Sequence, residues 1–167
     1  PDYTGALQSN QTVRLTDLRR HVQVVEQEPL LFHTSIDANV RYANPAATEA
    51  EVGRLVRALL ENARRQGDHI LDRLKTEQPR LRSVGDVRGK GLMCGIEIVR
   101  DRESKAPDGK AAKRIITRAW KRGLLAITAG ESTLRIAPPL VITRALVDRA
   151  LDILIDSIHD EESGKPL

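Results

Sequence analysis

Aromatic residues are almost missing from this sequence. Only 2% of its 167 residues are Phe, Tyr or Trp, whereas 40% are hydrophobic. A folded core must therefore be built from Leu, Ile, Val and Ala. A module that binds nucleic acid would normally interleave aromatic and basic residues, and no such pattern occurs. The composition predicts an aliphatic core and no nucleic-acid partner.

Cysteines and long apolar runs are also scarce. Cys94 is the single cysteine, so an internal disulfide is excluded, and a reducing compartment suits an unpaired thiol. No apolar run approaches the roughly 20 residues that span a bilayer. The N-terminus lacks the basic and then apolar pattern of a secretory signal. These absences predict a cytoplasmic protein without membrane insertion.

Histidines with the spacing of metal ligands are lacking too. The four histidines lie far apart in the sequence, at positions 21, 33, 69 and 159. Metal sites normally show short, repeated intervals between their ligands. No metal site is therefore predicted.

Charge is distributed unevenly along the chain. Residues 1–52 contain four Lys/Arg and seven Asp/Glu, whereas residues 53–167 contain 23 and 16. Such a change of sign indicates segments with separate origins. We therefore predict three parts, with a first segment over residues 1–52, a domain over residues 53–160 and a polar, frayed tail over residues 161–167.

The domain from residue 53 onward shows alternating helix and strand patterns. Thr48 and Glu51 have the spacing of a capping box, which predicts a helix from Thr48 to Lys75. The further elements expected are strands at Val84–Arg88 and Leu92–Val99, a helix at Gly109–Arg122 capped by Asp108, strands at Leu124–Thr128 and Thr133–Ala137, and a helix capped by Thr143. The order α-β-β-α-β-β-α predicts an α+β fold with helices on one face of a mainly antiparallel sheet. Within it, Cys94 is expected in the core and Trp120 as a packing anchor.

Two motifs in this domain carry a family resemblance. They are VGDVRGKGLMCGIEIV and, after a helix, RGLLAITAGESTLRIAPPLVIT. Residues 55–158 resemble the C-terminal small domain of class III pyridoxal-phosphate-dependent aminotransferases, the group that contains 4-aminobutyrate and ornithine transaminases. The resemblance implies that Arg135, in LRIAPPL, binds the carboxylate of an amino-acid or oxo-acid substrate. A guanidinium can make two parallel charged hydrogen bonds to a carboxylate. Read from the residues alone, Arg135 is a solvent-facing strand residue.

The cofactor machinery is expected elsewhere. Transamination needs a lysine that forms a Schiff base with pyridoxal phosphate, an acidic partner for the ring nitrogen and a phosphate cup. In the family these lie on a large domain that precedes the matching segment. Lys90, between two glycines, is the most suggestive lysine here, but nothing in the sequence builds an apolar pocket around it. We therefore assign no catalytic residue, expect no cofactor to bind this chain alone, and expect a large domain or a homodimer as partner.

The first segment carries a second resemblance. Residues 3–52, and above all VVEQEPLLFHTSI, resemble the Q-loop region of an ABC exporter ATPase domain. The resemblance implies a nucleotide-binding role for Gln27, whose amide oxygen could meet the nucleotide's Mg²⁺. Neither a phosphate-binding loop nor a Walker B strand accompanies it, so this ATPase-like segment is incomplete. Its strand at Val22–Val25 is expected to be an unpaired edge or to pair opportunistically.

Three functions are compatible with these patterns. The first is a fragment of a class III aminotransferase, inactive alone, with a foreign N-terminus. The second is a remnant of an ABC transporter ATP-binding subunit. The third is a binding or structural module that keeps only the fold. The longer of the two resemblances favours the first.

Overall fold

The computed structural model describes residues 35–42 and 44–167. The chain divides between Ala47 and Thr48 into two units, of which the second is the compact domain. In the first unit, Ser35 accepts a hydrogen bond from the amide of Ala38 and begins α2, Ile36–Arg41. The predicted strand at Val22–Val25 and the predicted nucleotide contact Gln27 lie outside the described residues.

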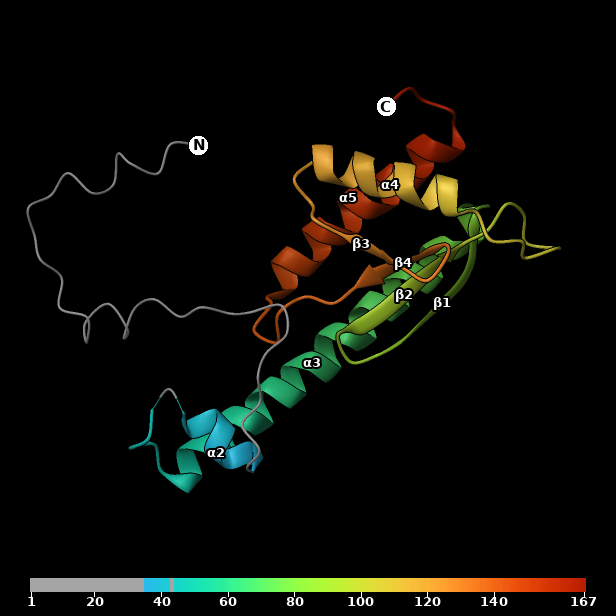
Figure 1. The fold of residues 1–167 in the computed structure, drawn as a ribbon. Helices are drawn as coiled ribbons and strands as arrows, with labels where there is room; N and C mark the ends of the chain where they lie inside the picture. The colour runs from blue at the N-terminus through green and yellow to red at the C-terminus, as the bar shows by residue number, and fades with distance from the viewer. Residues whose placement is uncertain (1–34, 43) are drawn as a thin grey trace, which may run out of the picture. The chain divides into compact units, whose positions relative to one another are not determined.

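The domain begins with a helix of 29 residues, α3, Glu49–Glu77 (Figure 1). The predicted capping box is confirmed, since Thr48 accepts from the Glu51 amide and the Glu51 carboxylate accepts from the Thr48 amide at 2.8 Å. A single 3-10 turn, Gln78–Arg80, follows with Pro79 at its start and ends the helix. The predicted division at residues 52 and 53 falls inside α3 and stays a prediction.

Four antiparallel strands form one sheet in the order β1-β2-β4-β3. The strands are β1, Val84–Lys90; β2, Met93–Ile98; β3, Ile127–Ala129; and β4, Thr133–Ile136. Helix α4, Gly109–Lys121, separates the two hairpins, and α5, Arg144–Glu162, ends the domain. Asp108 and Thr143 cap these helices as predicted. The predicted α+β order is confirmed.

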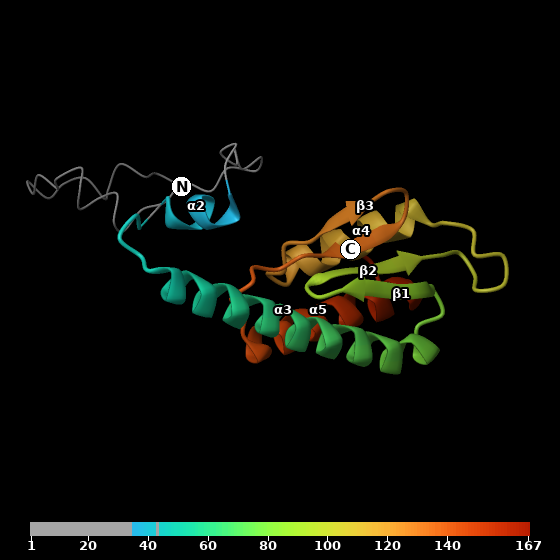
Figure 2. The ribbon, with the colours of Figure 1, turned by 90° about the horizontal axis from the view of Figure 1, so that it is seen from below.

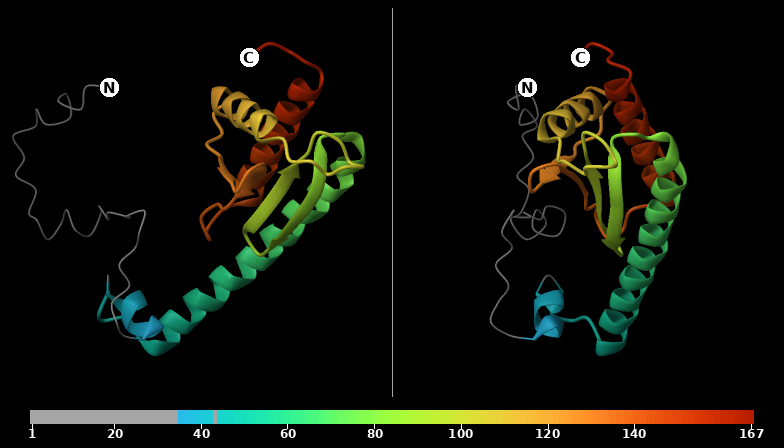
Figure 3. Two further views of the ribbon diagram at one scale, coloured as in Figure 1. Left: turned by 45° about the vertical axis from the view of Figure 1, so that its right-hand side comes forward. Right: turned by 90° about the vertical axis from the view of Figure 1, so that its right-hand side faces the viewer.

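The helices cover one face of this sheet and enclose an aliphatic core. Helix α3 packs on β1, while α4 packs on α5 and on β3 and β4 (Figures 1 and 3). Figure 2 shows α3 and α5 on one side of β1 and β2. The most deeply buried side chains come from all these elements and include Ile70, Leu74, Ile96, Ile98, Ile115, Leu134, Leu154 and Ile158. Cys94 lies in this core, as predicted.

The predicted strand at Leu124–Thr128 is shorter than expected. Strand β3 begins only at Ile127, because the amide of Leu124 donates instead to the Ala119 carbonyl at the end of α4. Gly123, with φ +87°, makes this helix-terminating turn possible. The Leu124 amide, with which the predicted strand would begin, is thus used in a hydrogen bond that ends α4.

Two further expectations are wrong. Trp120 is no packing anchor, since it is 64% exposed, whereas the adjacent residue Ala119 is buried. The C-terminal segment is not frayed from Glu161, because α5 continues to Glu162. Glu161 pairs with Arg114 and Arg118, which holds the last turn against α4. Among the described residues, no helix is long and apolar enough to cross a bilayer.

Candidate functional site

The outer face of the sheet, opposite the helices, carries the candidate site. Arg88 of β1, Gly95 of β2 and Arg135 of β4 are direct partners in the strand register, and Ile127 of β3 completes this row. Directly opposed residues in antiparallel strands lie on the same face. The fold therefore places two arginines on either side of a glycine.

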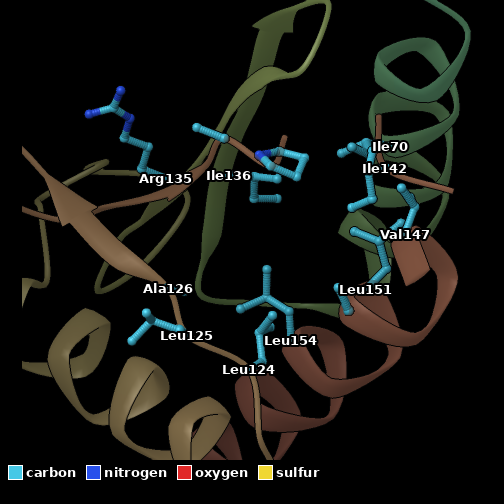
Figure 4. A pocket seen from close by; sticks show the side chains of 13 residues that line it. Ile70, Leu124, Leu125, Ala126, Arg135, Ile136, Ile142, Val147, Leu151 and Leu154 are labelled. Carbon is cyan, nitrogen blue, oxygen red and sulfur yellow. The ribbon is translucent and has the colours of Figure 1, made fainter. Parts of the chain in front are cut away.

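Arg135 itself reaches into solvent from the middle of the sheet. It is exposed, whereas its neighbour Leu134 is fully buried. Figure 4 shows its guanidinium pointing away from Ile136 and from the apolar cavity behind the strand. Within the described part of the chain, the Arg135 guanidinium has no hydrogen-bond or ion-pair partner. A free, strand-anchored guanidinium is suited to bind a carboxylate.

The missing side chain of Gly95 leaves a shallow hollow beside Arg135. The hollow has a volume of about 450 Å³ and is lined by Arg88, Gly89, Met93, Cys94, Gly95, Ala129, Thr133 and Arg135. A Cβ at position 95 would lie 2.9 Å from Cγ2 of Thr133. Glycine here keeps the floor of the hollow low between the two arginines.

A second row of polar residues lies beside the first. Asp86 and Glu97 are direct register partners, and Glu97 is also opposite Thr133. Nη1 of Arg88 donates to Asp86 at 2.9 Å and to Glu97 at 3.0 Å. These hydrogen bonds raise the pKa of the Arg88 guanidinium. Sequence reasoning missed this cluster, although the i, i+2 spacing of Asp86 and Arg88 signals one strand face.

An apolar cavity of about 170 Å³ lies on the other side of β4 (Figure 4). Its side chains come mainly from β4, α5 and the segment that leads into β3, and include Leu124, Ile136, Ile142, Val147, Leu151 and Leu154. It offers no polar side chain from α5. Arg135 is the one charged residue among the described residues that line it, and its guanidinium points away from the cavity (Figure 4), so the cavity suits apolar groups.

The lysines do not form a Schiff-base site. All seven lysines of the chain are exposed, including Lys90 at the end of β1. A cofactor lysine must be held neutral in a desolvated pocket. The described residues therefore do not fit the imine linkage of pyridoxal phosphate, and no step through that group is assigned to them.

Other reactive residues have ordinary structural surroundings. Cys94 is buried, which raises the pKa of its thiol and keeps it protonated. Nε2 of His69 lies 2.6 Å from Oδ1 of Asp148, and this contact joins α3 to α5. Among the residues that the structure describes, no group of three His, Cys, Asp or Glu side chains could hold a metal ion.

Comparison with known proteins identifies relatives of this fold and sequence. The sequence model of the class III aminotransferases matches residues 35–158. The chain is 34% identical over 147 residues to a leucine/methionine racemase of Thermococcus litoralis, covering 86% of this chain and 32% of that protein. It is 41% identical over 129 residues to an alanine/serine racemase of Pyrococcus horikoshii, covering 74% of this chain and 27% of that protein.

Solved structures agree with these sequence matches. A Bacillus anthracis aminotransferase superimposes with a TM-score of 0.58 and 34% identity, over 62% of this chain and 24% of that chain. The omega transaminase of Pseudomonas jessenii, in complex with PMP, gives a TM-score of 0.60 and 26% identity, over 64% of this chain and 24% of that chain. The chain thus spans about a quarter to a third of the length of these relatives.

The match also moves the limits that the sequence resemblance predicted. It begins at residue 35 rather than 55, and so includes residues 35–52, which had been likened to an ABC ATPase. None of the relatives and structures described above supports the ABC resemblance or a fusion. The chain belongs to the pyridoxal-phosphate-dependent class III aminotransferase family.

Proposed function

We propose that this chain supplies the C-terminal part of a class III pyridoxal-phosphate enzyme and that Arg135 binds the substrate's carboxylate there. The observation that carries the proposal is the free Arg135 guanidinium beside the hollow over Gly95. Its place in the motif LRIAPPL supports the same role by resemblance to the family. The substrate class is an amino acid or an oxo acid.

The proposed role depends on a surface that covers Arg135. An exposed ion pair contributes only about 0–1 kcal/mol, because water screens both charges. A bidentate hydrogen-bonded pair becomes stronger when water is excluded from it. A large domain of the same enzyme, or a second copy of it, would provide that exclusion. The chain by itself is therefore expected to bind carboxylates weakly and to catalyse nothing.

The reaction type is left to the rest of the enzyme. Both racemases and aminotransferases are among the relatives, and their identities to this chain overlap. A carboxylate contact would serve either reaction, because it orients the substrate without taking part in proton transfer. A cytoplasmic location belongs to the same proposal, since Cys94 is unpaired and pyridoxal enzymes need no oxidising compartment.

A chimera tests the role of Arg135. Residues 48–167 replace the matching segment of the Pyrococcus horikoshii alanine/serine racemase, and racemisation of alanine is measured. Arg135→Leu is expected to raise KM by about tenfold or more, since a charged hydrogen bond contributes about 1.5–3 kcal/mol. Arg135→Lys should raise KM by less than Arg135→Leu does.

The control is Arg149→Leu, which removes another exposed arginine, on α5. It should leave KM unchanged. An active chimera whose KM is the same with Arg135→Leu would contradict the proposed role. The unmodified 167-residue chain, mixed with pyridoxal phosphate, should show no absorbance of an internal imine.

A further inference from the structure

Glu97 has two arginines within reach on the outer face of the sheet. In the register, Gly95 is opposite both Arg88 and Arg135, and Glu97 lies two residues further along β2. Glu97 is therefore a diagonal neighbour of each arginine, at a spacing that long side chains can bridge. The structure pairs it with Arg88, at 3.0 Å, and leaves Arg135 free.

Glu97 pairs with Arg88 and not with Arg135 for a physical reason. Asp86 is directly opposite Glu97, so two carboxylates face each other across the strand pair. Like charges in this arrangement repel unless a cation lies between them. Nη1 of Arg88 donates to both carboxylates, at 2.9 and 3.0 Å, and so compensates the repulsion. Arg135 can bridge no such pair, since its register partners are Gly95 and Ile127.

We propose that Arg88 is a positioning residue that holds Glu97 away from Arg135 and thereby keeps Arg135 available for a substrate carboxylate. This inference rests on the proposed function of Arg135. Without Arg88, Asp86 repels Glu97, and Arg135, which is diagonal to Glu97 on the other neighbouring strand, has a guanidinium without a partner among the described residues. An internal carboxylate then competes with the ligand at high effective concentration. Arg88 acts through Glu97 and need not touch the ligand.

The experiment is a propionate titration of the isotopically labelled 167-residue chain at low ionic strength. Propionate is the probe because it offers one carboxylate and no other charge. The amide chemical shifts of Gly95 and Thr133 report binding, since both residues line the hollow. Arg88→Gln is expected to weaken propionate binding by about threefold to fivefold, the range set by one exposed ion pair. Arg88→Lys should retain most of the affinity.

Two double variants separate competition by Glu97 from a change in net charge. Arg88→Gln with Glu97→Gln should restore the affinity to within about twofold of the unmodified chain, because the competitor is gone. Arg88→Gln with Asp86→Asn has the same net charge but keeps Glu97. It should bind propionate more weakly than the double variant without Glu97, because the competing carboxylate is still present. Equal affinities of the two double variants, or an unchanged affinity of Arg88→Gln, would overturn the inference.

Arg135→Leu distinguishes this inference from the proposed function. If it leaves the propionate-dependent shifts unchanged, Arg135 is no carboxylate site and both proposals fail. If it abolishes the shifts while Arg88→Gln has no effect, only the role of Arg88 fails. Amide spectra of each variant without ligand check that the sheet is folded. Since Arg88 and Glu97 are surface residues, these spectra are expected to change only locally.

Discussion

Gly67 of α3 lies directly against the backbone of Gly91 in the β1–β2 turn. A Cβ at position 67 would lie 2.0 Å from the Gly91 carbonyl oxygen and 2.3 Å from its carbon. Since both contacts are to backbone, neither can yield by a side-chain rotation. The closest approach of helix and hairpin therefore requires glycine at position 67.

Gly67→Ala is accordingly expected to lower the free energy of unfolding by about 3 kcal/mol, because helix and hairpin must separate. Gly53→Ala is the matched control in the same helix. A Cβ there meets only the flexible Arg57 side chain, at 3.4 Å. This control should raise stability by about 0.4–1 kcal/mol, since alanine favours helix. Denaturant unfolding of both variants measures the difference, and equal effects would contradict the close approach.

Glu161 is expected to stabilise the C-terminal end of the domain. Its carboxylate accepts from Arg114 at 2.7 Å and from Arg118 at 3.3 Å, and the side chains of Arg118 and Glu161 are only 9% and 11% exposed. Glu161→Ala leaves the buried Arg118 charge without its carboxylate and should cost about 2–4 kcal/mol in chemical unfolding. Arg118 also donates to the Pro166 carbonyl at 3.1 Å, so the last residues should gain faster amide exchange.

The exposed pair of Glu61 and Arg64 provides the control for that experiment. Its side chains are 61% and 66% exposed, although the distance is a similar 2.8 Å. Glu61→Ala should leave the unfolding midpoint within error, because water screens such pairs. A large loss at both positions would mean that burial does not decide the contribution.

The contribution of the Asp148 carboxylate to the stability of the fold is expected to be lost in acid. Its hydrogen bond with His69, helped by attraction to Arg73, lowers the pKa of the Asp148 carboxyl below the ordinary value of 3.8. Because the folded-state pKa is below the unfolded value, the contribution is fully present above pH 3.8. It is lost as the pH falls through the folded-state pKa. The melting temperature of Asp148→Asn should thus fall less between about pH 7 and about pH 3.

Asp156→Asn is the control for the acid experiment. Asp156 is exposed on the same helix, α5, and this change should reproduce the acid profile of the unmodified chain. If Asp148→Asn also reproduces that profile, the contact with His69 adds nothing in solution.

A substitution at Thr133 of β4 is expected to recover the stability that is lost when Gly95 of β2 is replaced. Gly95→Ala places a Cβ 2.9 Å from Cγ2 of Thr133 and is expected to cost about 1–2 kcal/mol of unfolding free energy. Thr133→Ser removes that methyl group, so the double variant should recover most of the loss. Thermal unfolding of both single variants and the double variant gives the coupling. Strictly additive effects would show that the two side chains do not meet.

Local signals in the sequence were sufficient for the helices. Thr48, Asp108 and Thr143 each accept from an amide three residues ahead, so the capping pattern and the geometry lie within one turn. The buried alternation of β2, with Cys94, Ile96 and Ile98 inward, also follows from the chain itself. The predictions for Trp120 and Glu161 were wrong, because the surroundings of these residues depend on segments that are distant in the sequence.

The family resemblance drew attention to Arg135, but nothing in the residue pattern connected it with Arg88, Gly95 or Glu97. These four residues come together only because β2 lies between β1 and β4, and strand order and register depend on contacts between distant segments. Side-chain periodicity and helix caps act within a few residues and are therefore legible in the sequence. The pairing of Arg88 with Glu97, which leaves Arg135 free, is a property of the assembled sheet. The helices pack against one face of that sheet, and this packing decides which side chains lie together on the outer face.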